Sequence, residues 1–103
     1  MIGAAEGYIS SSVHAPSSGR VSAIEMRPAP HPSGLPDLSI VLETDGEERW
    51  IERQPLDCRA IDPAGLRQHL QDMGVVGLGG AVFPSHVKLN ASSLETLVIN
   101  AAE

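Results

Sequence analysis

Alternation of apolar and polar positions marks the first half of the chain and predicts short β-strands. Leu38, Ile40 and Leu42 alternate with their neighbours in the pattern of a half-buried strand. Asp45 and Gly46 follow as a hairpin signal. The segments predicted to be strands are residues 8–14, 20–26, 38–43 and 48–51. Short strands separated by turns predict a small barrel or sandwich, and the pattern leaves their tertiary arrangement open.

Proline and glycine separate these predicted strands. Residues 15–19 are predicted to form a turn, because Pro16 fixes φ and Gly19 is free to adopt a positive φ. Four prolines between residues 27 and 36 exclude a helix interior and a central strand. That stretch is therefore predicted to be an extended surface loop.

The pattern changes to a helical one in the second half. Three apolar residues recur at i, i+4 and i+7 and predict one helix face: Leu66, Leu70 and Met73. Asp62 is placed to cap the first turn and Pro63 occupies the favoured first helical position. Gly74 is suited to the left-handed conformation that ends a helix. Ser85 is predicted to cap a short helical turn, and residues 96–99 to form a buried strand.

Composition and charge exclude several functions. The 103 residues suit one small domain, or a domain and part of another, with an interior built mostly from Val, Ile, Leu and Ala because aromatic residues are scarce. A formal charge of −6 argues against nucleic-acid binding. Cys58 is the only cysteine, which excludes an internal disulfide and fits a reducing cytoplasm. No apolar run reaches the roughly 20 residues that span a bilayer.

Catalytic and metal-binding residues are not predicted. The chain has no Ser-His-acid arrangement that supports nucleophilic catalysis. Its histidines lack the spacing of paired metal ligands, and each is expected to be a surface or partly buried side chain: His14, His31, His69 and His86.

A glycine-rich segment, residues 77–84, is the strongest candidate for a binding site. Three glycines within four residues indicate unusual φ angles or a close approach of backbone amides to a ligand, because glycine loses the most backbone entropy on folding. Flat or anionic ligands such as nucleotides use such surfaces. The spacing fits neither the phosphate-binding loop nor the dinucleotide fingerprint, so a tight turn between two helices is an equal alternative.

Three polar residues near this segment are candidate ligand contacts. Lys88, the only lysine, is placed to present a positive charge to a phosphate, with an ordinary surface lysine as the alternative. Asn100 and Glu103 follow the predicted last strand, and ligands of open α/β sheets bind at the carboxyl ends of strands. The alternative interpretation is that both are solvated polar residues at a strand end.

The turn at residues 14–21 resembles the A-P-x-x-G-x-V opening of biotinyl and lipoyl carrier domains. Those domains carry a modified lysine on a hairpin tip further along the chain. No lysine precedes residue 88 here, which excludes acyl- or carboxyl-carrier chemistry in this half. The resemblance therefore implies a barrel-like fold without the carrier function.

Three segments in order resemble RnfC, a subunit of the Rnf ion-translocating electron transport complex. RnfC carries an H-A-x-x-S-G-x-V turn, then G-x-x-G-L-G-G-A-x-F-P-x-x-x-K, then N-A-A-E. The matching parts of this chain are residues 14–25, 74–89 and 99–103. The flavoprotein subunit of respiratory complex I has a variant of the same glycine motif. Val82 stands where relatives often have glycine, and Leu78 where complex I has arginine.

This resemblance implies an α+β chain with two parts. Residues 1–56 are expected to form a barrel-sandwich hybrid domain, and residues 57–103 the helix, glycine loop and strand that open an α/β domain for FMN and NADH. The protein orients the flavin and tunes its electronics in such a site. The residues implied to contact the cofactor are Gly77, Gly79, Gly80, Ala81, Phe83, Lys88, Asn100 and Glu103.

The implied function is that of part of an electron-input subunit that passes electrons between NADH and ferredoxin. That subunit is expected to be peripheral at the cytoplasmic face of the inner membrane, where other Rnf subunits move ions. Two 4Fe-4S clusters are expected from cysteine motifs outside these 103 residues. The isolated chain is therefore expected to be inactive and to bind FMN weakly or not at all. The alternative is a docking or scaffold module formed by residues 1–56.

Overall fold

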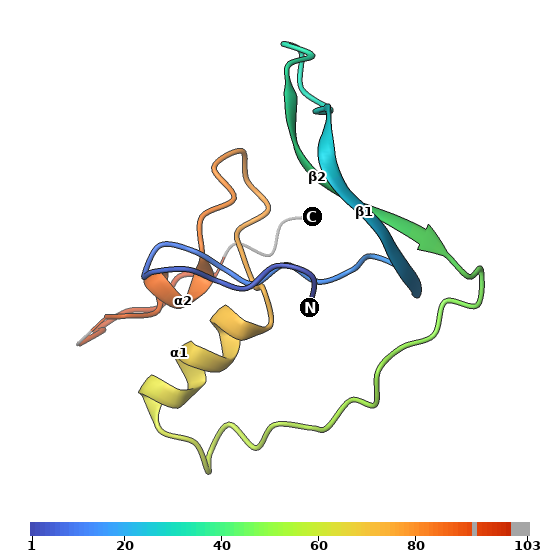
Figure 1. Cartoon of the computed structure of the whole chain (residues 1–103). Helices are drawn as coiled ribbons and strands as arrows, with labels where there is room; N and C mark the ends of the chain where they lie inside the picture. Colours follow the sequence, from blue (N-terminus) through green and yellow to red (C-terminus); the bar gives the residue numbers. More distant parts are fainter. Residues whose placement is uncertain (92, 100–103) are drawn as a thin grey trace.

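The computed structural model describes residues 1–91 and 93–99. Two strands, β1 (Gly19–Pro28) and β2 (Pro36–Thr44), pair as an antiparallel hairpin (Figure 1). This confirms the two strands predicted from the alternating pattern. The loop between them is shorter than the predicted residues 27–36, because Arg27 and Pro28 belong to β1 and Pro36 to β2, and hydrogen bonds within residues 29–35 make it a turn rather than an extended segment. The predicted mixed α+β class is also confirmed, since two helices follow the hairpin.

One face of the hairpin is apolar. Cross-strand pairing places six apolar residues on it: Val21, Ile24, Met26, Leu38, Ile40 and Leu42. A bulge between Val21 and Ala23 inserts Ser22 as an extra residue, so that Val21 pairs with Leu42. Without the bulge, regular alternation would turn Val21, three positions before Ile24, to the opposite face. We call this set the apolar sheet face.

Helix α1 (Pro63–Asp72) has the predicted signals at both ends. The Asp62 carboxylate accepts a hydrogen bond from the Gly65 amide at 2.8 Å. At the other end Gly74 has a φ of 74° and donates to the Gln71 carbonyl, while the Val75 amide donates to the Leu70 carbonyl, both at 3.1 Å. These two bonds are the Schellman arrangement, in which glycine avoids the steric cost of a left-handed residue.

Helix α2 (Ser85–Lys88) is a single turn that carries Lys88 as predicted. Ser85 is the first helical residue rather than the cap, which corrects the prediction. The capping position belongs to Pro84, whose side chain offers no hydrogen bond to the free amides.

The predicted strand at residues 8–14 is wrong. This stretch forms one isolated bridge, between Gly3 and Val13. The Ser12 amide donates instead to the Gln71 carbonyl at 3.0 Å. The Gln71 carbonyl, which also accepts from Gly74, lies in the last turn of α1 and takes the amide that a neighbouring strand would have used. We call residues 1–14 the N-terminal segment.

The predicted returning strand at residues 48–51 is also wrong. The Asp45 carboxylate accepts a hydrogen bond from Ser18 and pairs with the Arg49 guanidinium, which folds the chain back toward the start of β1. Glu48 has a φ of 50°, and this left-handed conformation interrupts an extended strand.

The last predicted strand, residues 96–99, lies in a loop with exposed apolar side chains, including Val98 at 85 % exposure. A strand needs backbone partners, and within residues 1–91 and 93–99 no backbone hydrogen bond reaches this stretch. The predicted strand end at Asn100, and Glu103, lie outside the described residues.

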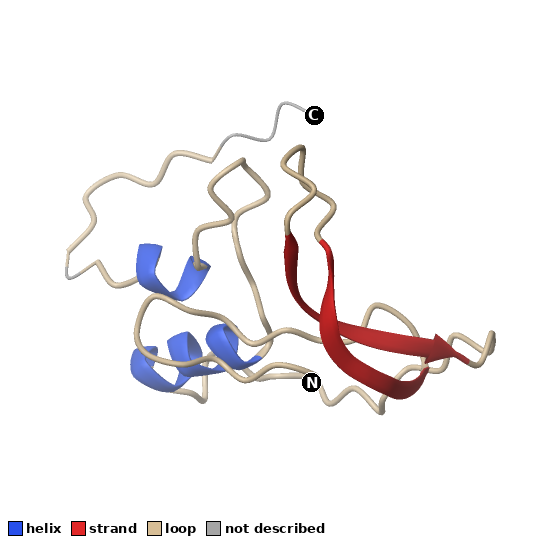
Figure 2. Cartoon of the chain, turned by 45° about the horizontal axis from the view of Figure 1, so that its top comes forward, coloured by secondary structure: helices blue, strands red, loops and turns tan. Residues whose placement is uncertain are grey.

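The expected apolar interior does not form among the described residues. The buried residues there are Ser12, Pro84 and His86. The radius of gyration is 16.9 Å, whereas a compact domain of this length has about 13 Å. The hairpin and the helices do not pack on each other, as Figure 2 shows. The hairpin therefore keeps most of its apolar residues exposed, whereas Leu66 and Leu70 of α1 are half-buried.

Candidate ligand-binding loop

The glycine-rich segment folds as a narrow hairpin, which we call the glycine loop (residues 76–84). Val76 and Pro84 form an antiparallel bridge at its base. The Gly77 amide donates to the Phe83 carbonyl at 2.9 Å, and the Val82 amide donates to the Gly79 carbonyl at 3.0 Å. The loop is therefore held by its own backbone, with residues 79–82 at the tip.

The glycines of the loop leave its backbone uncovered by side chains, and they do not supply unusual φ angles. A Cβ added at Gly79 or Gly80 would meet nothing within 4 Å, so the backbone at the tip is bare. None of the three glycines of the loop has a positive φ; that conformation belongs to Val82, at 46°. A β-branched residue is strained in this region. Of the two interpretations of the glycine pattern, the structure favours accessible backbone.

The one lysine lies at the base of the loop. A Cβ added at Gly77 would come 2.7 Å from the Lys88 amine, so the missing side chain lets that amine approach the backbone. The amine also lies 5.8 Å from the centre of the Phe83 ring. Among the described residues Lys88 makes no ion pair, which leaves its charge available to an anion.

The structure brings together part of the predicted site. Gly77, Phe83 and Lys88 meet at the base of the loop, while Gly79 and Gly80 form its tip. Ala81 lines the groove described next. Asn100 and Glu103 lie outside the described residues, so their part in a site stays a prediction.

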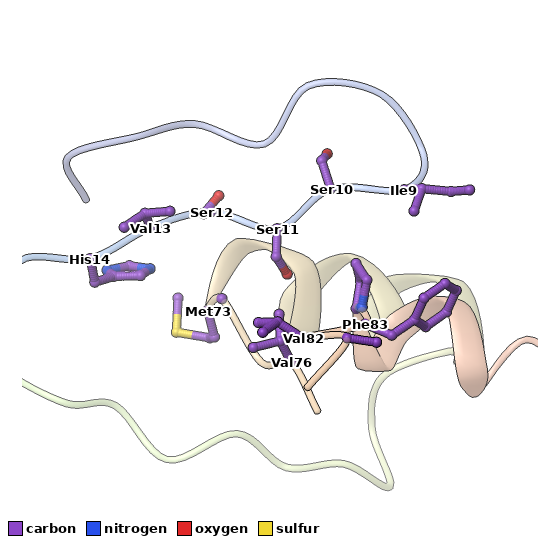
Figure 3. Close-up of a pocket in the computed structure, with 13 residues that line it drawn as sticks. Ile9, Ser10, Ser11, Ser12, Val13, His14, Met73, Val76, Val82 and Phe83 are labelled. Carbon is purple, nitrogen blue, oxygen red and sulfur yellow. The ribbon is translucent and has the colours of Figure 1, made fainter. Parts of the chain in front are cut away.

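A groove of about 630 Å³ separates the glycine loop from the N-terminal segment. The side chain of Ser11 points across it toward Val76 and Val82 (Figure 3). The Ser11 hydroxyl oxygen is buried and has no hydrogen-bond partner among the described residues. Most of the remaining lining is apolar, including Met73 and Phe83.

Sequence reasoning missed the residues that hold the N-terminal segment in place. The Gln71 side chain donates to the carbonyls of Gly7 and Ser10, at 3.1 and 3.2 Å. The His14 ring donates from Nε2 to the Asp72 carbonyl at 2.8 Å. His86 is buried rather than at the surface and donates from Nε2 to the backbone of the same segment. No local sequence pattern predicts these hydrogen bonds, because each joins positions about 60 residues or more apart.

The described residues show neither a metal-binding cluster nor a membrane-spanning helix. Within the described part of the chain no group of His, Cys, Asp or Glu side chains is placed to hold a metal ion. The helices α1 and α2 are both too short and too polar to cross a bilayer.

Known families match both parts of the chain. Residues 1–47 match the RnfC barrel sandwich hybrid domain, and residues 70–103 match the Nuo51 FMN-binding domain. The resemblance to RnfC is confirmed. The RnfC match covers the N-terminal segment and the β1–β2 hairpin, and the FMN-binding match covers the glycine loop and α2.

Individual proteins agree with this resemblance. Over 94 residues the chain is 51 % identical to the C subunit of the ion-translocating oxidoreductase complex of Edwardsiella ictaluri, which includes 88 % of the chain and 12 % of the relative. Over 102 residues it is 48 % identical to the protein of the same name from Pseudomonas aeruginosa, which includes 95 % of the chain and 13 % of the relative. The chain thus spans about an eighth of the length of these RnfC relatives.

Proposed function

We propose that this chain is the part of an RnfC-type electron-input subunit that holds FMN against the glycine loop. The observation that carries the proposal is one loop with bare backbone at its tip, at Gly79 and Gly80, and the free charge of Lys88 at its base, within the segment that matches an FMN-binding domain. A flat ring needs an unobstructed backbone surface, and its phosphate needs a cation.

The described residues fit FMN in three ways. Gly79 and Gly80 present backbone without side chains, where a ring system is able to lie. Lys88 supplies a point charge for a phosphate, and Phe83 supplies an apolar surface beside it. When bound, the flavin supplies hydride and single-electron chemistry, and the chain binds and orients it. The roles of Ala81, Asn100 and Glu103 in this site remain part of the proposal.

The whole subunit is proposed to pass electrons between NADH and ferredoxin, with two 4Fe-4S clusters supplied by chain outside these 103 residues. Its other partners would be the remaining subunits of the complex, and it would lie at the cytoplasmic face of the inner membrane. Within the chain, residues 1–56 would belong to the barrel-sandwich hybrid domain and residues 57–103 to the flavin domain. The names of the relatives support the membership in an ion-translocating complex.

A chimera tests the flavin site. The matching segment of the Pseudomonas aeruginosa subunit is replaced by residues of this chain, and FMN and riboflavin affinities are measured by fluorescence quenching. We expect FMN to bind more tightly than riboflavin, since only FMN has the phosphate for Lys88. Lys88→Met should weaken FMN binding roughly tenfold, the range of a hydrogen bond to a charged group, and leave riboflavin unchanged.

The matched control is Arg59→Met, which removes a positive charge from the exposed segment before α1. It should leave both affinities unchanged. A chimera that binds no FMN, while the unmodified Pseudomonas aeruginosa subunit binds it, would contradict the proposal. Equal losses in Lys88→Met and Arg59→Met would show that only net charge matters.

A docking role for residues 1–56 is the second candidate, and the apolar sheet face favours it. Ile24 and Leu38 are 64 % and 67 % exposed on that face, and exposed apolar surface of this kind marks interaction sites. Replacing Ile24 and Leu38 with Ser in the chimera should weaken complex assembly while flavin content stays constant. Unchanged assembly would count against this role.

A further inference from the structure

His86 is a buried side chain at the junction of the N-terminal segment and α2. It is 4 % exposed and its Nε2 donates to the Tyr8 carbonyl at 2.8 Å. The carbonyl only accepts, so the ring proton is on Nε2, and Nδ1 is buried without a partner among the described residues. The imidazole also meets the Tyr8 ring edge-to-face, with centroids 5.9 Å apart.

A second hydrogen bond, from a residue just after α2, holds the same tyrosine. The Asn90 side-chain amide donates to the Tyr8 hydroxyl at 3.0 Å. Tyr8 is therefore held by its backbone and by its phenol, through residues that lie two positions before and two positions after Lys88. We call this arrangement of Tyr8, His86 and Asn90 the Tyr8 clasp.

The clasp matters because α2 has little stability of its own. The helix is four residues long and has no side-chain cap at its start. Single helical turns do not persist in water without tertiary contacts, since nucleation fixes several residues for one hydrogen bond. The position of the Lys88 amine beside Gly77 thus depends on what holds the turn.

We propose that Tyr8 and His86 are positioning residues that hold α2 so that the Lys88 amine stays at the base of the glycine loop, ready for the phosphate of a bound flavin nucleotide. This inference rests on the proposed FMN site for its ligand. It assigns the N-terminal segment, which matches the barrel domain, a part in nucleotide recognition by the loop that matches the FMN-binding domain.

The decisive variants of His86 differ in whether they keep a hydrogen-bond donor at the position of Nε2. In His86→Gln the side-chain amide nitrogen lies where Nε2 lies, so the bond to the Tyr8 carbonyl is kept. In His86→Asn the amide reaches only the position of Nδ1, and in His86→Leu no donor remains. We expect FMN affinity in the chimera to fall about fivefold for His86→Leu and His86→Asn, the size of one neutral hydrogen bond, and to be preserved in His86→Gln.

The ratio of FMN to riboflavin affinity separates positioning from general support of the fold. Loss of the phosphate contact lowers FMN binding alone, so the ratio should fall about fivefold in His86→Leu. A purely structural defect lowers both affinities together and keeps the ratio. An unchanged ratio in His86→Leu, or a ratio lost equally in His86→Gln, overturns the proposal.

A flavin-independent measurement keeps this inference distinct from the proposed function. In the 103-residue chain, nuclear Overhauser contacts between the Lys88 side chain and the Gly77 α-protons report the amine position directly. They should vanish in His86→Leu and persist in His86→Gln, while the Gly65 amide at the cap of α1 stays unshifted as a check on folding. Contacts that persist in His86→Leu refute the clasp, even if the chimera binds no FMN and the proposed function fails.

Discussion

The β1–β2 hairpin and the region built from the N-terminal segment, the glycine loop and the two helices are held together in opposite ways. The hairpin is local, because its strands are joined by a short loop and pair residue by residue. In the helical region, hydrogen bonds from His14, His86 and Asn90 join positions 58, 78 and 82 residues apart. We call this second part the clasped region.

The difference shows where each part is vulnerable. A two-stranded hairpin is marginally stable alone and gains from whatever covers its apolar face. The clasped region instead relies on backbone groups that meet at a few close approaches, such as Gly74 against Ser12. Substitutions at these approaches should therefore disturb the clasped region and leave the hairpin register unchanged.

Gly74→Ala should have the largest effect. Gly74 has a φ of 74°, and an added Cβ would meet the Ser12 carbonyl oxygen. Strain and collision together should destabilise the clasped region by roughly 3 kcal/mol. Hydrogen exchange of the α1 amides would report the loss. The matched control is Gly7→Ala, with a φ of 77° and open space, for which we expect about 1 kcal/mol.

Equal losses in these two variants would show that the contact with Ser12 contributes nothing. Faster hydrogen exchange across β1 and β2 in Gly74→Ala would contradict the view that the hairpin and the clasped region are stabilised separately, because it would show that they unfold together.

Val82→Gly should have a smaller effect of opposite sign. The backbone of Val82 is left-handed at 46°, where glycine has no steric penalty. We expect the glycine loop to gain about 1 kcal/mol, seen as slower exchange of the Gly77 amide that bonds Phe83. Val75→Gly, at a residue without a positive φ, should instead speed that exchange. Faster exchange in Val82→Gly would disprove the strain.

Asp45→Asn should have the smallest effect, confined to the hairpin end. Hydrogen bonds from the Ser18 hydroxyl and the Glu47 amide, together with the Arg49 guanidinium, lower the pKa of Asp45 from 3.8 to about 2. Its contribution to stability is complete above pH 3.8 and is lost as the pH falls through about 2. The Arg49 amide donates to the Ser18 hydroxyl oxygen, and its chemical shift should therefore follow the titration of Asp45 with a midpoint near pH 2.

That titration should be absent in Asp45→Asn, and amides of the clasped region should not follow it. A midpoint near the ordinary value of 3.8 would show that these bonds do not persist in solution.

Local signals predicted several elements well. Asp62, Pro63 and Gly74 marked the ends of α1, because capping depends on residues within a few positions of each other. The alternation of Leu38, Ile40 and Leu42 marked β2 for a similar reason. The strand predicted at residues 96–99 failed, since a strand pattern cannot supply the neighbour with which a strand must pair.

The candidate site was predictable only in part. The glycines and Lys88 were recognisable as a motif, and the structure brings Gly77, Phe83 and Lys88 together. Tyr8 and His86 carried no signal, because their contact spans most of the chain and consists of one ring nitrogen and one backbone carbonyl. Such a contact depends on where α1 and the glycine loop direct the chain.

By itself, the sequence determined the two hairpin strands, the ends of α1, the glycine motif and the resemblance to RnfC. All of these depend on residues close together in the chain or on a linear pattern. Only the tertiary structure decided that residues 8–14 lie against α1 and α2 rather than in a sheet. The reason is physical: backbone carbonyls at the end of α1 and the buried ring of His86 gave this segment its hydrogen bonds, and those partners come together only in the folded chain.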